Sequence, residues 1–397
     1  MSKNWMKAVQ DRVKKVPVSS GRSDKLGRIS FCDLVFLPAQ LVSRPVNYFK
    51  EPISAKTIMG KQSARPVELE TPIAIAAMSF GALSRNAKAA LAKASTMAGT
   101  IENTGEGGML PEEREFSSKL TIQYSTGRFG IDEEVLKKAD VIEIKIGQGA
   151  KGGQGGLLPK DKVTAEIAAI RKVPLGQDIH SPAYHQDITT IEDLKAKVAW
   201  LRELSKGAPI TIKLAAGHVA KDIELAVMAD PDIIAVDGLE GGTGAAPDIM
   251  LNEVGLPALA ALPIARRTLD RLGARQELWI GGGFSEGSEA AKALALGADG
   301  VFFGFSLLAA MGCASCNQCY LGKCPRGITT QDQELVKKLD IDVAAANVSN
   351  FIKNCTEEIK MAAGACGRSS VHDLDAGDLR ALTLEAARIT GAAFIAD

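Results

Sequence analysis

The sequence has no surplus of charge of either sign, because 47 lysines and arginines balance 47 aspartates and glutamates over 397 residues. Binding to nucleic acid or to an anionic membrane surface depends on an excess of basic side chains, so the balance argues against both partners. No apolar run approaches the ~20 residues of a membrane-spanning helix, and no signal-peptide core follows residues 1–5. We therefore expect a soluble, cytoplasmic protein.

Cysteine is sparse everywhere except in one segment. Four of the seven cysteines stand between residues 313 and 324, namely Cys313, Cys316, Cys319 and Cys324, and proline follows the last. A Cys-x2-Cys-x2-Cys run with a later Cys-Pro is a spacing that iron–sulfur clusters use. A structural zinc site with four sulfur ligands is the alternative, and its usual form has two separated Cys-x2-Cys pairs. Disulfides are a poorer interpretation, because nothing in the sequence indicates an oxidising compartment.

From about residue 71 the sequence alternates short apolar or β-branched runs with glycine-rich turns and amphipathic helices. The runs expected to be strands are Ile73–Met78, Thr100–Asn103, Leu120–Tyr124, Val141–Ile146, Ile210–Ala215, Ile233–Asp237, Leu278–Gly281 and Gly300–Phe303. Helices expected between them include Asn86–Ala98, Ile191–Ser205, Val219–Ala229 and Ser285–Leu296. This repeat over ~230 residues predicts an α/β protein with a (β/α)8 barrel. A doubly wound open sheet is the competing architecture.

We expect four parts along the chain. An N-terminal arm (residues 1–70) lies over the main domain, which is the barrel (71–310). The loop with the four cysteines (311–331) follows the eighth strand, and a helical extension (332–397) ends the chain. The helices expected in the extension are Gln333–Leu339, Val343–Ala363 and Ala381–Ile389.

Glycines stand at the ends of the last two expected strands. Gly281, Gly282 and Gly283 end the seventh strand, and Gly304 ends the eighth. Glycine lets backbone N–H groups approach an anion, and the helix that follows adds its positive end. Phosphate pockets of barrels commonly lie after these two strands. The pattern therefore predicts a phosphorylated cofactor, whereas ATP chemistry has no support because no G-x-x-x-x-G-K-[S/T] loop is present.

Two lysines, Lys145 and Lys213, interrupt strands that are otherwise apolar on both sides of them. Since side chains alternate along a strand, their apolar neighbours face the helices and the two lysines face the barrel interior. Two inward ammonium groups are costly unless they meet anions. A flavin edge that becomes negative on reduction, or a substrate carboxylate, would supply them. The alternative for either lysine alone is a side chain that points to solvent.

Six segments carry longer motifs, and these are Met78–Ser84, Asn103–Gly108, Ser125–Gly130, Glu143–Gly156, Gly241–Pro247 and Cys324–Gly327. Together they resemble the FMN-binding synthase domain of glutamate synthases. The similarity is closest to the short, archaeal-type version and its relatives, which include the methylglutamate synthase subunit. It extends over about residues 30–390.

The resemblance implies FMN in the barrel and an iron–sulfur cluster close to the flavin. It implies a cofactor site at Met78, Ser79, Glu106, Ser125, Lys145, Gln148, Lys213, Asp237, Gly242, Thr243, Gly281, Gly282, Gly283 and Gly304. Glutamate synthases hold a three-iron cluster with three cysteines spaced like Cys313, Cys319 and Cys324. Cys316 is additional and would complete a four-iron cluster, so both 3Fe-4S and 4Fe-4S are considered.

Two departures from the family pattern concern the substrate. Gln154 replaces the family's glutamate in a Pro-Gly-Glu-Gly-Gly segment, and the loop 214–218 is shorter than in the large glutamate synthases. His218 in this loop is a candidate ligand for a carboxylate, with a capping or surface role as the alternative. The glutaminase domain of the family, whose nucleophile is an N-terminal cysteine, has no counterpart in this sequence. We therefore expect ammonia from solution or from a partner subunit.

The function implied by the resemblance is reductive amination of a 2-oxo acid, as in the formation of glutamate from 2-oxoglutarate and ammonia. Electrons from ferredoxin or a pyridine-nucleotide-oxidising subunit would pass through the cluster to FMN. Lys213 would polarise the imine or the flavin edge, while Gln148 and Lys145 position substrate and flavin. Two alternatives are a methylglutamate synthase-type subunit that uses methylamine and glutamate, and an electron-transfer or scaffold subunit of a larger complex. An oligomer is expected in each case.

Overall fold

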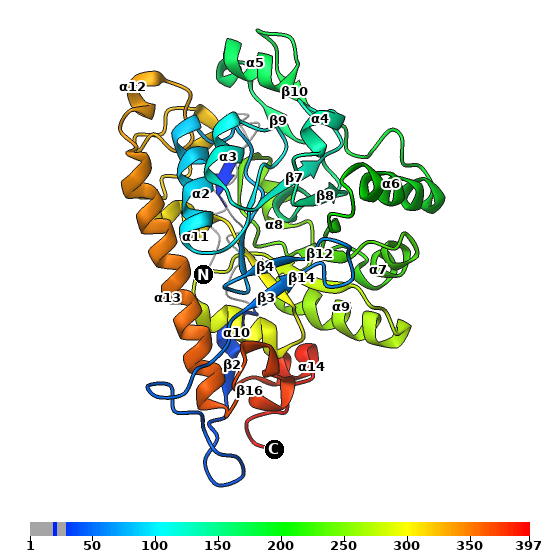
Figure 1. Cartoon of the computed structure of the whole chain (residues 1–397), viewed down its shortest axis with the longest axis vertical. Helices are drawn as coiled ribbons and strands as arrows, with labels where there is room; N and C mark the ends of the chain where they lie inside the picture. The colour runs from blue at the N-terminus through cyan, green and yellow to red at the C-terminus, as the bar shows by residue number, and fades with distance from the viewer. Residues whose placement is uncertain (1–18, 22–28) are drawn as a thin grey trace, which may run out of the picture.

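The computed structural model describes residues 19–21 and 29–397 (Figure 1). Its centre is a sheet of eight parallel strands in the order β5-β15-β14-β12-β11-β8-β7-β6. Their bounds are β5 (Ile73–Ile75), β6 (Glu102–Asn103), β7 (Leu120–Tyr124), β8 (Val141–Lys145), β11 (Ile210–Ala215), β12 (Ile233–Asp237), β14 (Glu277–Gly281) and β15 (Gly300–Phe303). The two edges meet, since the Ile75 N–H donates to the Ile101 carbonyl at 3.1 Å. The sheet is a nearly closed barrel, which confirms the predicted (β/α)8 fold and excludes the open sheet.

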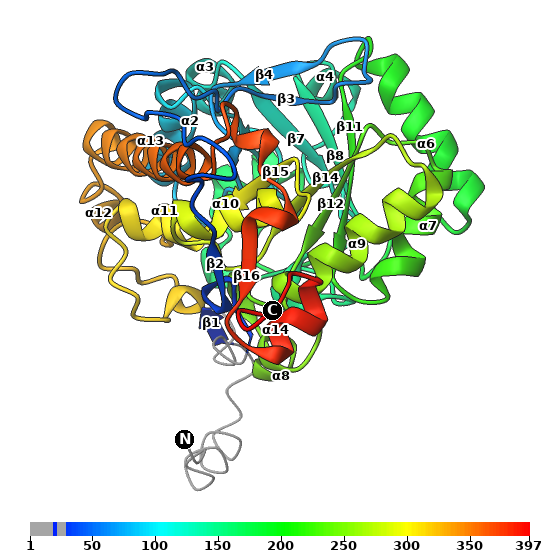
Figure 2. The ribbon, with the colours of Figure 1, turned by 90° about the horizontal axis from the view of Figure 1, so that it is seen from below.

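Helices cover the outside of the barrel (Figure 2). They are α2 (Arg85–Met97), α3 (Pro111–Phe116), α4 (Glu133–Leu136), α5 (Ala165–Arg171), α6 (Ile191–Leu204), α7 (Val219–Met228), α8 (Asp248–Asn252), α9 (Ala258–Leu272), α10 (Gly287–Ala295) and α11 (Phe305–Ala310). Alternate strand residues such as Ile144 and Ile212 pack in the core shared with the helices, whereas Trp279 and Phe302 belong to a separate interior cluster. Because side chains alternate along a strand, Lys145 next to Ile144 and Lys213 next to Ile212 point into the barrel.

A hairpin closes the barrel interior at the amino ends of the strands. Its two strands, β3 (Thr57–Met59) and β4 (Val67–Leu69), pair antiparallel just before β5 begins. Met59 and Leu69 are buried in the same cluster as Trp279 and Phe302. Because this end is filled with apolar side chains, the opposite end, where the strands have their carboxyl ends, is the one that can hold a ligand.

The connection between β8 and β11 is the longest excursion from the barrel. It contains a small antiparallel pair, β9 (Leu157–Leu158) with β10 (Ile179–His180), together with α5 and the 3₁₀ turns η2 (Gly149–Lys151) and η3 (Lys160–Lys162). After β12, the short strand β13 (Thr243–Ala246) pairs with β1 (Ser19–Gly21). Both additions lie beyond the carboxyl ends of the barrel strands, so they build the walls of the site.

The segment after β15 carries the cysteine loop, with the 3₁₀ turn η4 (Cys319–Leu321), and then α12 (Gln333–Val336) and the long helix α13 (Ile341–Ala365). Helix α13 packs against α2, α10 and α11. The chain ends with the turns η5 (Val371–Asp373) and η6 (Ala376–Asp378), the strand β16 (Leu379–Ala381) and α14 (Leu384–Thr390). Strand β16 pairs with β2 (Leu34–Phe36), which follows η1 (Phe31–Asp33), so the two ends of the described chain are joined.

Two helix predictions in the extension were too long. The segment predicted as Ala381–Ile389 starts as the end of β16, and α14 begins only after Thr383, whose hydroxyl accepts the Ala386 N–H. The helix predicted to end at Leu339 ends at Val336. The division of the chain at residues 70, 310 and 331 stays a prediction, and most of the first 28 residues lies outside the described part. Among the described residues, no helix combines the length and the hydrophobicity needed to cross a membrane.

Candidate active site

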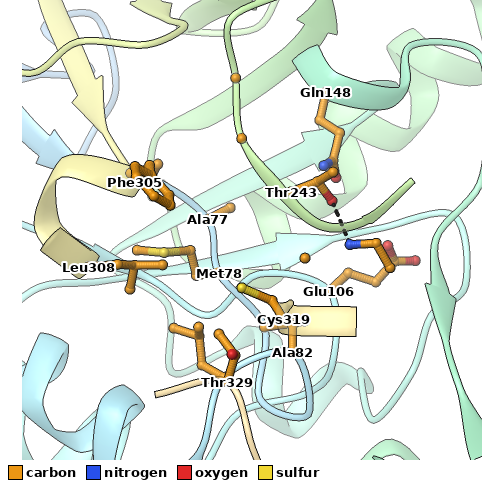
Figure 3. A pocket seen from close by; sticks show the side chains of 18 of the residues that line it. Ala77, Met78, Ala82, Glu106, Gln148, Thr243, Phe305, Leu308, Cys319 and Thr329 are labelled. Atoms are coloured by element: carbon orange, nitrogen blue, oxygen red, sulfur yellow. Dashed lines mark hydrogen bonds between the residues drawn. The ribbon is translucent and has the colours of Figure 1, made fainter. Parts of the chain in front are cut away.

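A cavity opens at the carboxyl ends of the barrel strands, and the cysteine loop forms part of its wall (Figure 3). All but one of the residues predicted for the site line it: Met78, Ser79, Glu106, Lys145, Gln148, Lys213, Asp237, Gly242, Thr243, Gly281, Gly282, Gly283, Gly304, Cys313, Cys316, Cys319 and Cys324. The exception is Ser125, which is buried and whose carbonyl accepts the Arg128 N–H. Its assignment to the cofactor stays a prediction. One space therefore combines strand-end lysines, glycines and cysteines.

Lys213 is inward, as predicted, but its partner belongs to the protein. Its Nζ lies 3.1 Å from Oδ2 of Asp237 on the neighbouring strand and 5.3 Å from the centre of the Phe302 ring. Burial lowers the pKa of Lys213, but the carboxylates of Asp237 and Glu143 outweigh it, so the pKa is raised above its ordinary value. Lys213 is therefore a fixed positive charge at the cavity floor.

Lys145 lies beside Lys213 in the register of β8 and β11 and has its own carboxylate. Its Nζ is 2.9 Å from Oε2 of Glu106. Burial raises the pKa of Glu106, but Lys145 and other donors outweigh it, so that the pKa lies below its ordinary value. The second oxygen of Glu106, Oε1, is buried without a hydrogen-bond partner among the described residues. It is an acceptor available to a ligand.

Three further buried cations line the cavity, besides the exposed Arg326, and no carboxylate among the described residues lies within 4.0 Å of any of the three. They are Lys151, Lys162 and Arg171, all from the β8–β11 connection and all buried. Burial, followed by repulsion from Lys145, lowers the pKa of Lys151 to about 8. Burial also lowers the pKa of Lys162 to about 8 and that of Arg171 to about 10. The cavity thus carries more positive than negative charge.

Arg171 is held against the loop that follows β5. Its Nη2 donates to the Phe80 carbonyl at 2.5 Å and to the Ser79 hydroxyl at 3.3 Å, while its Nε is buried without a partner among the described residues. A Cβ at Gly107 would lie 2.8 Å from the same Nη2. Glycine at this position therefore makes room for the guanidinium.

The glycines after β14 and β15 allow a close approach. A Cβ at Gly281 would lie 2.3 Å from Oδ1 of Asp237, and Gly282 has φ +127°, which side-chain-bearing residues rarely adopt. Gly304 precedes α11, whose first turn holds Ser306. The Ser306 hydroxyl is buried and, within residues 19–21 and 29–397, has no hydrogen-bond partner. An unpartnered hydroxyl next to bare backbone suits an anionic group of a ligand.

The four cysteines differ in their surroundings. Cys324 is buried, Cys313 and Cys319 are half-buried, and Cys316 is exposed. Burial raises the pKa of the Cys324 thiol, but backbone N–H groups of residues 326, 328 and 329 outweigh it and lower the pKa. Such N–H···S contacts stabilise a thiolate, which is the form that binds metal.

The exposed Cys316 sits in an unusual piece of backbone. Ser315 before it has φ +51° and Asn317 after it has φ +53°. For residues with a side chain this left-handed conformation costs about 1–2 kcal/mol each. The rest of the loop therefore imposes the backbone geometry around Cys316, whose side chain is exposed.

The cysteine loop is tied to the loop after β5. The Ser84 hydroxyl donates to the Gly327 carbonyl at 2.6 Å, and Gln331 Nε2 donates to the carbonyls of Gly81 and Leu83 at 3.1 and 3.0 Å. Figure 3 shows the result, with Cys319 beside Ala82. The cysteines therefore lie next to the part of the cavity formed by the loop of Met78 and Ser79.

Sequence reasoning missed Lys151, Lys162, Arg171 and Ser306. The three cations lie in the connection after β8, where no barrel strand was expected. Lys151 follows Lys145 closely in the sequence, and this proximity is the only signal that could have suggested it. Two residues singled out for their departure from the family pattern do not line the cavity. Gln154 and His218 are exposed, and His218 precedes α7 without capping it through its side chain.

The chain was compared with known proteins by sequence and by structure. The family model for the conserved region in glutamate synthase matches residues 28–369. A glutamate synthase large subunit-like protein of Rhizobium meliloti (strain 1021) is 40% identical over 377 residues, which cover 90% of this chain and 85% of that protein. The archaeal glutamate synthase [NADPH] of Methanocaldococcus jannaschii is 41% identical over 375 residues, or 87% and 74% of the two chains.

Solved structures with the same architecture are more distant in sequence. A flavocytochrome b2 variant with benzoylformate superposes with a TM-score of 0.58 at 16% identity and covers 91% of this chain and 80% of that one. A mandelate oxidase variant with an FMN adduct superposes with a TM-score of 0.56, also at 16% identity, covering 92% and 97%. At this identity the likeness concerns the fold.

Proposed function

Because the chain belongs to the glutamate synthase family, we propose that it forms glutamate by reductive amination of 2-oxoglutarate, with FMN in the barrel and an iron–sulfur cluster on the cysteine loop. The observation that carries the proposal is that one cavity is lined both by the strand-end lysines and glycines and by all four cysteines. The proposed flavin site and the proposed point of electron entry therefore share a wall. A structural zinc ion on the same cysteines transfers no electrons, so it would not need to lie beside a cofactor cavity.

The residues present fit FMN. Gly281 to Gly283, Gly304 and the unpartnered Ser306 hydroxyl would hold the phosphate, since bare backbone and a free hydroxyl suit its oxygens. Lys213 and Lys145 supply fixed cations at the floor, and Gln148 and Thr243 line the wall above them. One edge of the flavin ring becomes negative on reduction, and these side chains would supply the hydrogen-bond donors and positive charges that this edge needs.

The cysteine loop fits an iron–sulfur cluster. Cys313, Cys319 and Cys324 are the better-buried three, and the N–H groups around Cys324 favour its thiolate. Cys316 is the candidate fourth ligand, and its exposure leaves both the three-iron and the four-iron form open to test. When bound, the cluster would deliver electrons one at a time and FMN would supply a hydride to the imine carbon.

The chain's own residues would prepare the substrate for that transfer. Lys213, held charged by Asp237, would polarise the imine or face the flavin edge that is negative in the reduced state. Lys145 and Gln148 orient the substrate, and Glu106, through its unpartnered Oε1, accepts a hydrogen bond from ammonia or the protonated imine. The buried position of these groups excludes water that would hydrolyse an imine.

The surplus of cations favours a substrate with two carboxylates. Arg171 has an unpartnered Nε, and Lys151 lies in the same cavity without a carboxylate of its own among the described residues. Uncompensated buried cations are costly, and a dianionic 2-oxo acid would offset that cost on binding. Gln154, which departs from the family pattern, is exposed and outside the cavity lining, so it does not change the groups that line the site.

The proposal is tested by product analysis. Protein purified without oxygen and supplied with a reductant, 2-oxoglutarate and ¹⁵N-ammonia is expected to form ¹⁵N-glutamate, detected by mass spectrometry. The same protein given methylamine and glutamate tests the methylglutamate synthase-type alternative, whose product is N-methylglutamate. Absence of both products from cofactor-loaded protein would favour the electron-transfer or scaffold alternative. A ferredoxin, a pyridine-nucleotide-oxidising subunit and a glutaminase-type subunit are the partners we propose.

Replacing Arg171 with methionine is expected to raise the KM for 2-oxoglutarate by about 10- to 100-fold. The reason is that a charge-assisted hydrogen bond to a buried carboxylate contributes about 1.5–3 kcal/mol. Steady-state kinetics with 2-oxoglutarate and with a monocarboxylic 2-oxo acid measure the effect. Lys172→Met is the control, because Lys172 is the next residue in the chain and its side chain is exposed. An equal rise for both acids would mean that Arg171 only holds the Ser79 loop in place.

The KM for 2-oxoglutarate is also expected to rise as the pH increases through about 8. Below that pH Lys151 is protonated and attracts the substrate, whereas above it the ammonium loses its proton and the attraction is lost. Kinetics between pH 6.5 and 9.5, with circular dichroism to follow the fold, measure the profile. Lys151→Met should start with the higher KM and show a flatter profile. A variant profile identical to that of the parent protein would assign the titration to another group.

A further inference from the structure

Lys162 is a buried cation that bridges two loops of the cavity. It ends η3 in the β8–β11 connection, and only 4% of its surface is exposed. Its Nζ lies 3.2 Å from the carbonyl oxygen of Cys319 and 3.4 Å from that of Ala82. One partner belongs to the cysteine loop and the other to the loop that follows β5. The ammonium therefore sits where the two loops meet.

The stem of Lys162 packs against the turn that carries Cys319. A Cβ placed on Gly322, which has φ +67°, would lie 3.1 Å from Lys162 Cγ. The turn η4 (Cys319–Leu321) thus lies on the lysine stem, and glycine at its end makes this contact possible. The side chain is held at both its stem and its head, so the position of the charge is well defined.

The charge of Lys162 is not balanced by the protein's carboxylates. Among the described residues, none has a carboxylate oxygen within 4.0 Å of its Nζ, and two carbonyl oxygens are its hydrogen-bond partners. Burial lowers the pKa of Lys162 most, negative charge at Cys319 and Cys324 works in the opposite direction, and Arg171 lowers the pKa further. A buried ammonium held only by carbonyls is costly unless an anion lies near it. The nearest candidate is whatever the cysteines bind.

We propose that Lys162 is the counter-cation of the cluster on the cysteine loop and that it raises the reduction potential of this cluster. The inference rests on the proposed function, because it presupposes an iron–sulfur cluster. A cluster bound by thiolates is anionic, and reduction adds one more negative charge. A fixed cation nearby stabilises the reduced form more than the oxidised form, and net charge and hydrogen bonding around the sulfurs are established levers on cluster potential.

The position of Lys162 also has a consequence for electron transfer. Because its second partner is the Ala82 carbonyl, it stands on the side of the cysteines that faces the loop of Met78 and Ser79, where the flavin is proposed. A higher cluster potential makes the cluster easier to reduce by the electron donor. Lys162 acts through the cluster, so it is a positioning residue and not a catalytic one.

The test is a potentiometric titration followed by electron paramagnetic resonance, on anaerobically prepared full-length protein. The variants are Lys162→Gln, which keeps a donor without the charge, Lys162→Met, which keeps only the stem, and Lys162→Arg, which keeps the charge. Lys160→Met, an exposed lysine of the same turn, is the matched control. Iron, sulfide and flavin contents are measured on each preparation, and so is the KM for 2-oxoglutarate.

Lys162→Gln and Lys162→Met are expected to lower the midpoint potential by an amount equivalent to about tenfold in the reduction equilibrium, or about 59 mV for one electron. Lys162→Arg and Lys160→Met should leave it unchanged. If both neutral variants lose the cluster while Lys162→Arg retains it, the cation is needed for assembly, which also supports the proposal.

Two results would overturn the inference. The first is an unchanged midpoint potential in the neutral variants that keep a full cluster. If the KM for 2-oxoglutarate rises in those variants while the potential stays unchanged, Lys162 binds the substrate instead of acting on the cluster. The second is loss of the cluster in all three Lys162 variants, including Lys162→Arg, which would make the role steric. Zinc, or no metal, in the parent protein would instead contradict the proposed function, so the two failures are distinguishable.

Discussion

Lys213→Met is expected to lower the rate of glutamate formation by about two to four powers of ten, the range observed when a positioned charge stabiliser or proton donor is lost. Lys213 lies in the barrel floor, 3.1 Å from Asp237, with its pKa raised by that carboxylate and by Glu143 despite its burial. Its side chain is thus positively charged at neutral pH. Flavin and iron contents should change little, because the phosphate glycines and the cysteines are untouched.

The variant also removes one partner of a buried ion pair, which commonly costs about 3–5 kcal/mol of stability because the other charge is left uncompensated. The double variant Lys213→Met with Asp237→Asn removes both charges and separates the two effects. It should recover thermal stability without recovering activity. Lys119→Met, which lies outside the cavity lining, is the control for both. Full activity in folded, cofactor-loaded Lys213→Met would make this lysine structural.

The second large effect is expected from the cysteines. Cys319→Ser should lose the cluster, because this residue belongs to the better-buried three and its turn rests on Lys162. Flavin should remain bound, while turnover driven by a one-electron donor should fall to background. Iron and sulfide analysis, together with electron paramagnetic resonance of oxidised and reduced protein, measure the outcome.

Cys316→Ser distinguishes the two cluster types. If Cys316 is a ligand, the oxidised parent protein is silent in electron paramagnetic resonance and the variant shows a three-iron signal. The exposed position of Cys316 between two residues of left-handed backbone makes it the natural ligand to lose first. A three-iron signal in the parent protein that is unaffected by Cys316→Ser would make this cysteine a bystander.

Much of the fold could be predicted because it depends on local patterns. The eight strands show up as short apolar runs, and a buried parallel strand needs apolar residues whichever neighbours it has. The inward direction of Lys145 and Lys213 follows from alternation alone. The start of α14 was harder, because the residues before it pair as β16 with β2, which lies more than 300 positions away. The carbonyls of Val336 and Leu339, at and after the end of α12, accept from the distant Asn86 side chain, which local sequence does not reveal.

The partners of the lysines could not be predicted in the same way. Glu106 and Asp237 were assigned to the cofactor. The pairing of Asp237 with Lys213 depends on the register between β11 and β12, and that of Glu106 with Lys145 on the path of the loop after β6, neither of which a single strand reveals. The cations Lys151, Lys162 and Arg171 lie in the β8–β11 connection, which lacks the strand–helix repeat of the barrel. Only the folded structure of this connection brings them over the ends of the strands. Ser306 is noticeable only because its hydroxyl is buried and unpartnered among the described residues.

In the proposed reaction, this one chain carries FMN and uses it to reduce an imine formed from a 2-oxo acid and ammonia. The most direct measurement is a single turnover. Protein purified without oxygen is reduced, freed of excess reductant and mixed with 2-oxoglutarate, ammonia or both, while flavin absorbance is followed. We expect the flavin to be reoxidised only when both are present, with about one glutamate formed per flavin. Protein without flavin, or reduced flavin that neither combination reoxidises, would contradict the account.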